Sequence, residues 1–322
     1  MDTSILTTLS RLAPDLMEEA ELRALILERV GALGPIGRRA LAARLRLTER
    51  EVRAAADALK EAGCLVQSAA GMELTPEGCE LVEAARTVSR GRRTQQSMER
   101  TLARKLGVQR LSIVRGDADI DGDVAADAAH VAAQQLRLML HGAHVLGVGG
   151  GELMAQVAEN VALAAPMEIT VVPAMGGTGG SARIQPGTVA DVLAQRLGGQ
   201  SRPLYLPNGA PREAVQALCV LPQVRETLEL IGHAEVLLYE VGSARDAAAQ
   251  ALGFCFGENG QVIGPGQTLA LSADELGRRS CAAVAAGSGS AEAILALCRH
   301  HAHALLVTDE GAARRLTELL RT

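Results

Sequence analysis

Two arginines stand where a helix could carry them to nucleic acid. Arg50 and Arg53 lie on the outward face of a helical segment that Thr48 can cap with its hydroxyl. Glu51, three residues further on, can accept the backbone N–H of Thr48 in return, which completes a capping box. Guanidinium groups on the first turns of such a helix can reach phosphates and guanine edges in a major groove. These residues predict a recognition helix.

The neighbouring segments predict the elements that would hold this helix. Residues 34–66 indicate two short helices joined by a tight turn, and an apolar helix over 14–30 precedes them. Two short apolar pieces around the glycine turn 69–71 predict a β-hairpin wing. A long helix over 77–106 follows. We therefore expect a winged helix–turn–helix domain over residues 1–90, which includes the start of that long linker helix.

Charge is divided unequally along the 322 residues. Up to Arg110 the chain has 18 basic and 15 acidic residues, whereas the remainder has 14 and 22, so the net charge of −5 conceals a basic first third. Between Pro35 and Lys60 there are seven basic residues and three acidic ones. Contact with DNA phosphates requires such a concentration of positive charge.

Composition limits the remaining classes of protein. The chain is 48% hydrophobic but has no Trp, two Tyr and two Phe, so we expect two domains with aliphatic, alanine-rich cores. No apolar run approaches the ~18 residues of a membrane span, and the N-terminus has no signal pattern, so we expect a cytoplasmic protein. The six cysteines form no C-x-x-C pair or zinc spacing, so we expect no metal site.

A second group of residues suited to chemistry is rich in glycine. The segments 149–152, 175–180, 242–243 and 287–290 each follow a short apolar run, and several precede a helix. Free backbone N–H groups and the helix dipole at such points favour an anion. Several of these loops together predict a polar, anion-receptive crevice. No segment matches G-x-x-x-x-G-K-[ST], so we expect no nucleotide cofactor.

Alternating apolar and helical segments predict the elements that would position these loops. Strands are expected at 111–114, 144–148, 168–173, 203–206, 235–241, 281–286 and 304–307. Helices are expected at 124–140, 153–164, 189–197, 213–218, 291–299 and 311–320. This alternation predicts an α/β domain over 91–322 with a doubly wound, mostly parallel, Rossmann-like sheet. In such a sheet, ligands bind past the carboxyl ends of the strands.

Five stretches resemble a known family over nearly the whole chain. PIGRRALAARLRLTEREVR, GMELTPEGCEL, VGGGE, VPAMGG and VTDEGAARRL are similar to segments of the SorC/DeoR-type sugar-responsive transcription factors. The resemblance implies a winged helix–turn–helix followed by an effector domain related to phosphosugar isomerases. It also implies a homodimer or homotetramer that represses transcription until a sugar phosphate binds.

The resemblance extends to individual residues. We expect the following to face DNA: Arg38, Arg39, Thr48, Glu49, Arg50 and Arg53. The expected effector-binding residues are Gly149, Gly150, Gly151, Glu152, Met175, Gly176, Gln185, Gly287, Ser288, Gly289 and Ser290, where Gln185 is assigned from its order in the chain alone.

The effector loops match the family in backbone but not in charge. In a member of this family the effector is fructose 1,6-bisphosphate. The resemblance places Glu152 where that member has a threonine, Met175 where it has an arginine and Ser290 where it has a lysine. Each charge-assisted phosphate contact contributes roughly 1.5–3 kcal/mol, so we expect these changes to weaken bisphosphate binding by several orders of magnitude. We hypothesise that the crevice has kept its shape and has changed or lost its ligand. Five arginines could compensate: Arg183, Arg245, Arg278, Arg314 and Arg315.

An enzyme is the alternative, because the same fold also serves sugar-phosphate isomerases and deaminases with accessory domains. Asp309 and Glu310 lie at a strand end, where a general acid or base would be needed. Carboxylates at the start of a helix more often cap it, however, and an isomerase has no use for a recognition helix. We therefore expect a DNA-binding regulator without catalytic residues, with operator DNA and a small sugar or sugar phosphate as its partners.

Overall fold

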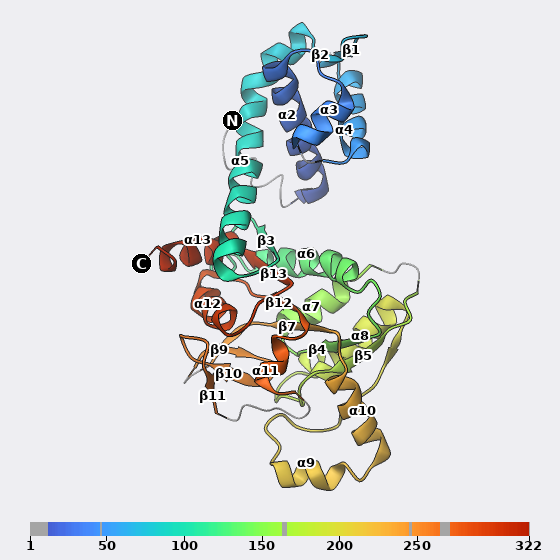
Figure 1. The fold of residues 1–322 in the computed structure, drawn as a ribbon, viewed down its shortest axis with the longest axis vertical. Helices are drawn as coiled ribbons and strands as arrows, with labels where there is room; N and C mark the ends of the chain where they lie inside the picture. Colours follow the sequence, from blue (N-terminus) through green and yellow to red (C-terminus); the bar gives the residue numbers. More distant parts are fainter. Residues whose placement is uncertain (1–11, 46, 163–165, 245–246, 265–270, 322) are drawn as a thin grey trace. The chain divides into compact units, whose positions relative to one another are not determined.

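The computed structural model describes residues 12–45, 47–162, 166–244, 247–264 and 271–321. The chain forms two compact units, residues 1–97 and 98–322 (Figure 1). The boundary between them falls within the long helix α5, Pro76–Leu106.

The N-terminal unit is a winged helix–turn–helix domain. Its elements in chain order are α2 (Pro14–Leu33), α3 (Arg38–Leu45), α4 (Glu49–Glu61), β1 (Leu65–Gln67), β2 (Met72–Leu74) and the start of α5. The two strands form an antiparallel hairpin in which Leu65 pairs with Leu74, and Ile36 adds a bridge to Met72. One aliphatic core joins these elements, because Ile26 of α2, Leu41 of α3 and Val52 of α4 are all buried. The predicted wing and helix pair are confirmed.

The C-terminal unit contains a seven-stranded sheet in the order β3-β13-β12-β7-β4-β5-β6, and every neighbouring pair is parallel. Its strands are β3 (Arg110–Val114), β4 (Val145–Val148), β5 (Thr170–Pro173), β6 (Gln200–Ser201), β7 (Val236–Glu240), β12 (Ser280–Val284) and β13 (Leu305–Asp309). The chain proceeds outward from β4 through β5 to β6, then returns at β7 and proceeds the other way. The doubly wound α/β prediction is confirmed, with the switch point between β4 and β7.

Helices cover both faces of this sheet, and consecutive strand residues alternate between two cores. On one face Leu238, Ala282 and Val307 pack with α6 (Asp123–Met139), α7 (Glu152–Asn160) and α8 (Pro186–Leu197). On the other face the partners come from the end of α5, α10 (Pro222–Gly232), α11 (Ala273–Leu276), α12 (Ala291–His300) and α13 (Glu310–Leu319). Small side chains, such as the four buried alanines of α6, let these helices approach the sheet closely.

Three parts of this unit differ from the sequence-based expectation. The strand predicted at 203–206 is wrong: the edge strand is β6, and Pro203 has no N–H to extend the pairing. Helix α10 follows α9 (Arg212–Leu218) and was not expected. A four-stranded antiparallel sheet is inserted after β7, and its strands are β8 (Gly242–Ala244), β9 (Ala247–Ala251), β10 (Phe254–Phe256) and β11 (Val262–Ile263).

Within the described ranges, no helix is both long enough and apolar enough to cross a membrane.

Candidate DNA-binding and effector sites

The start of α4 is fixed by the predicted capping box. The Glu51 N–H donates to the Thr48 hydroxyl at 3.2 Å, and the Thr48 N–H donates to a Glu51 carboxylate oxygen at 2.7 Å. Two N–H groups that the helix leaves free are thereby satisfied, which fixes where the first turn begins.

The first two turns of α4 present two exposed arginines. Arg50 has no ion-pair partner among the described residues, and its side chain is exposed. Arg53 lies 3.8 Å from Glu49, which also lies 4.0 Å from Arg39, so one carboxylate faces two guanidinium groups. Such exposed pairs stabilise little, so a DNA phosphate can replace the carboxylate at small cost.

Arg38 occupies a less open position than the other arginines. Its guanidinium lies 3.4 Å from the Asp57 carboxylate, on the outward face of α4. The side chain is about one-third exposed, compared with 93% for Arg39. Arg38 therefore links α3 to α4, whereas Arg39 projects into solvent.

The predicted effector loops meet at one edge of the sheet. Residues 149–151 follow β4, residues 174–180 follow β5 and residues 285–290 follow β12. In the order β12-β7-β4-β5, β4 and β5 are neighbours, and β7 alone lies between β4 and β12. All three loops leave the carboxyl ends of parallel strands beside the switch point, which is where ligands bind in such sheets.

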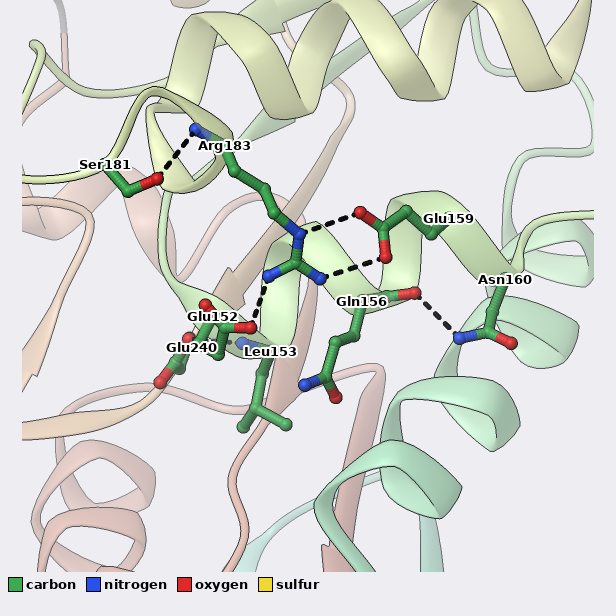
Figure 2. A network of polar contacts seen from close by, with 8 residues as sticks. All are labelled: Glu152, Leu153, Gln156, Glu159, Asn160, Ser181, Arg183 and Glu240. Atoms are coloured by element: carbon green, nitrogen blue, oxygen red, sulfur yellow. Dashed lines mark hydrogen bonds and ion pairs between the residues drawn. The ribbon is translucent and has the colours of Figure 1, made fainter. Parts of the chain in front are cut away.

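The anion position at the start of α7 is occupied by a carboxylate of the chain itself. Glu240, the last residue of β7, accepts a hydrogen bond from the Leu153 N–H at 3.1 Å (Figure 2). Gly151 precedes α7 with φ +127°, and a Cβ there would lie 2.2 Å from the Glu240 oxygen. Burial raises the pKa of Glu240, the bond from Leu153 opposes that shift, and the charge of Glu152 adds to it.

Beside this helix start, Arg183 joins two acidic residues of α7. Its Nε and Nη2 each donate to one Glu159 oxygen at 2.9 Å, and its Nη1 donates to Glu152 (Figure 2). The hydrogen bond from Arg183 lowers the pKa of Glu159, and the two carboxylates raise the pKa of Arg183. The guanidinium is thus committed to the protein's own carboxylates.

The 287–289 loop is filled in the same way. Its three consecutive N–H groups donate to Asp309 at 2.6 Å, Asp117 at 3.1 Å and Asp119 at 2.7 Å. The Ser288 hydroxyl also donates to Asp119, at 2.8 Å. The anions that the 287–289 loop receives are therefore side chains from residues 117–119 and from the end of β13.

The other predicted effector residues line the same edge without offering a positive charge. Met175 is buried, and the Gln185 amide oxygen accepts the Thr178 N–H at 2.9 Å. The Ser290 hydroxyl donates to the Gly287 carbonyl at 2.7 Å. Backbone packing explains two glycines, because a Cβ on Gly150 or Gly176 would lie within 2.6 Å of backbone atoms, and Gly149 is buried beside the Leu252 and Tyr239 side chains.

The arginines that could compensate for the missing cations are placed elsewhere or paired. Besides Arg183, Arg314 pairs with Glu310 at 2.6 Å, and Arg315 pairs with Glu292 at 2.9 Å. Arg278 precedes β12 and so belongs to the opposite edge of the sheet, and Arg245 lies outside the described residues.

Three carboxylates of this edge escaped the sequence reasoning: Asp117, Asp119 and Glu240. Glu240 was detectable, because it ends the apolar run of β7 directly before Val241-Gly242. Asp117 and Asp119 flank one alanine after β3, but nothing local links them to a loop about 170 residues away. Among the described residues, no group of three or more His, Cys, Asp or Glu side chains could hold a metal ion.

A winged helix joined to a doubly wound domain with loops at its switch point defines a ligand-controlled DNA-binding regulator. Residues 20–88 match the family described as "CggR N-terminal DNA binding domain", and residues 93–250 and 243–318 match the one described as "Putative sugar-binding domain". The chain belongs to the SorC family of sugar-binding transcriptional regulators.

Relatives of known name agree with this assignment. The chain is 30% identical over 327 residues to the central glycolytic genes regulator of Bacillus subtilis, covering 95% of this chain and 96% of that protein. A SorC family regulator from Enterococcus faecalis is 30% identical, with a TM-score of 0.63 over 69% of this chain and 99% of its own. The full-length sorbitol operon regulator SorC from Klebsiella pneumoniae, 16% identical, shares the fold over 93% of this chain and 99% of its own, with a TM-score of 0.63.

These relatives decide between the two alternatives. They are named as transcriptional regulators and not as enzymes, so the regulator interpretation is confirmed over the isomerase. The geometry of Asp309 agrees, because its carboxylate accepts the N–H groups of Ala118, Gly287 and Ala312 and so caps α13. The chain is a DNA-binding regulator with a sugar-binding domain.

Proposed function

We propose that the protein is a cytoplasmic repressor of sugar-metabolism genes that binds its operator through α4 and leaves it when a sugar occupies the strand-end crevice. The observation that carries this proposal is the exposed Arg50 on the capped first turn of α4. The name of the Bacillus subtilis relative, which refers to central glycolytic genes, supports the choice of target genes.

Operator recognition would use a homodimer or homotetramer, so that two copies of α4 lie in successive major grooves. Arg50 and Arg53 would contact phosphates and guanines, and Arg53 would exchange Glu49 for DNA. Effector binding would change the spacing of the two copies of α4. Since half-site spacing is fixed by the operator, such a change would lower affinity.

The direct test is a mobility-shift titration of the full chain on an operator selected from random DNA. Arg50→Ala and Arg53→Ala should each weaken operator binding by about 5- to 100-fold. Each should also make the slope of log affinity against log salt concentration shallower by about one. The C-terminal unit, residues 98–322, is called the sensor unit from here on. Arg202→Ala, which removes an exposed arginine of this unit, is the matched charge control. Unchanged operator binding in both α4 variants would refute the role of this helix.

A further inference from the structure

The start of α7 is an anion position of the C-terminal unit. It lies at the carboxyl end of β4 beside the switch point, and it is the first turn of a nine-residue helix. Free N–H groups and the helix dipole at such a point attract a phosphate or a carboxylate. The group found there is the Glu240 carboxylate, bonded to the Leu153 N–H (Figure 2).

The local backbone is built around this carboxylate. Gly151 has a positive φ, and any side chain there would collide with the Glu240 oxygen, as its Cβ would lie 2.2 Å away. The glycine in this loop therefore makes room for Glu240. A ligand phosphate could reach the Leu153 N–H only after the Glu240 side chain had moved away.

Electrostatics oppose a second anion in the same place. Two unit charges about 4 Å apart at an effective dielectric constant near 20 repel enough to lower affinity by ~10³-fold. Glu152 is a second carboxylate in the same turn, and the nearby guanidinium of Arg183 already has three hydrogen bonds to Glu152 and Glu159. Met175, where a cation would be needed, is buried and uncharged.

We propose that Glu240 determines the class of effector: its carboxylate takes the place of a ligand phosphate, so the sensor rejects phosphorylated sugars and responds to an unphosphorylated one. This inference rests on the proposed function, because it concerns the ligand of that same crevice. The hydroxyls of a neutral sugar can donate hydrogen bonds to a carboxylate, whereas a phosphate dianion has none to donate.

The test is isothermal titration of the full chain with fructose 1,6-bisphosphate and with inorganic phosphate. The wild type should bind neither at millimolar concentration. Glu240→Ala should bind both at least 10-fold more tightly than the wild type, because it removes both the charge and the obstruction. Glu240→Gln removes only the charge, so its affinity for both ligands should lie between that of the wild type and that of Glu240→Ala.

Glu235→Gln is a matched control from the other end of the same strand. The Glu235 carboxylate also accepts backbone N–H groups, those of His144 at 2.5 Å and Val145 at 2.9 Å, but at the edge of the sheet away from the crevice. This variant should bind phosphate no better than the wild type. If it gains as much as Glu240→Ala, the effect is general charge removal and the proposal fails.

Two results would overturn the assignment of Glu240. One is micromolar binding of fructose 1,6-bisphosphate by the wild type, and the other is no gain in the alanine and glutamine variants whose thermal melts show that they are folded. The wild-type titration decides even if both variants fail to fold. Operator binding is measured separately, so loss of the regulator function and loss of this inference give different outcomes.

Discussion

Thr48 and Glu51 exchange hydrogen bonds across the first turn of α4, the proposed recognition helix, each side chain accepting the other residue's backbone N–H. Both residues are exposed, so neither contributes to the core. The pair therefore sets where α4 begins and how its first turn, with Arg50 and Arg53, is directed. The hydrogen bonds that cap α4 and the arginines proposed to contact DNA therefore lie at the same end of the helix.

Thr48→Ala should lower the stability of the winged domain by about 1 kcal/mol, because the Glu51 N–H loses its side-chain acceptor. Operator affinity should fall with it, since the arginines of that turn lose their fixed direction. Thermal melts of the full chain and mobility shifts measure the two effects. Thr48→Ser keeps the hydroxyl and should behave as the wild type; a serine variant as impaired as alanine would mean that the cap is not the cause.

Glu49→Gln should increase affinity for non-specific DNA several-fold. The Glu49 carboxylate lies 3.8 Å from Arg53 and 4.0 Å from Arg39, so its removal frees two guanidinium groups and takes a negative charge away from the phosphates. Mobility shifts on random-sequence DNA over a range of salt concentrations check this. Unchanged affinity at low salt would mean that Glu49 does not face the duplex.

The parts that sequence reasoning predicted well are those with local causes. The capping box lies within four residues, and the apolar stripe of α4 repeats at helical spacing, so the helix and its start after Thr48 were predicted correctly. The parallel sheet followed from alternating buried strands and helices, which is a regional signal. The strands of the inserted antiparallel sheet have two to five residues and were missed, because such short runs have little periodicity.

The contents of the effector loops could not be predicted, because their partners come from distant segments. Eighty-seven residues separate Glu240 from Leu153, and 171 separate Asp117 from Ser288. The glycines correctly indicated free N–H groups at strand ends. Whether those groups bind a ligand or a carboxylate of the chain itself depends on strand order. The order places β7, which ends in Glu240, beside β4.

Glu240→Gln should stabilise the sensor unit at neutral pH. Burial raises the folded-state pKa of Glu240, so ionisation at neutral pH favours the unfolded chain and costs the fold stability. The gain in melting temperature over the wild type should be greatest above the folded pKa and should disappear as pH falls below about 4.5, where the group is protonated in both states. A gain that persists in acid would have another origin, such as altered packing.

A buried pair of histidines should make the sensor unit sensitive to acid. The Tyr239 hydroxyl lies 2.9 Å from Nε2 of His301 and 3.0 Å from Nε2 of His303, and the two rings stack with centroids 4.4 Å apart. Burial, together with repulsion from the neighbouring histidines, lowers the pKa of His301 to about 3, and burial lowers that of His303 to about 4. Both rings are therefore neutral in the fold wherever the unfolded chain would begin to protonate them.

The sign of the pH dependence follows from these depressed values. Well above pH 6.5, the ordinary pKa of a histidine, the two side chains are neutral in both states and do not alter stability. As pH falls from there toward 4, the two histidines bind about two protons in the unfolded chain but stay neutral in the folded protein. The free energy of unfolding therefore falls by ~1.4 kcal/mol per pH unit for each proton. Denaturant titrations followed by circular dichroism between pH 7 and pH 4.5 should show this loss.

His303→Gln separates this titration from other acid effects. The glutamine amide can still form a hydrogen bond with the Tyr239 hydroxyl but cannot take up a proton. The slope of the free energy of unfolding against pH should therefore correspond to about one proton fewer than in the wild type. It should also be less stable than the wild type at pH 7, because the ring's packing is lost. His141→Gln, which removes an exposed histidine, is the control for the loss of an imidazole elsewhere in the chain. Equal slopes for the wild type and His303→Gln would show that the buried pair does not govern acid stability.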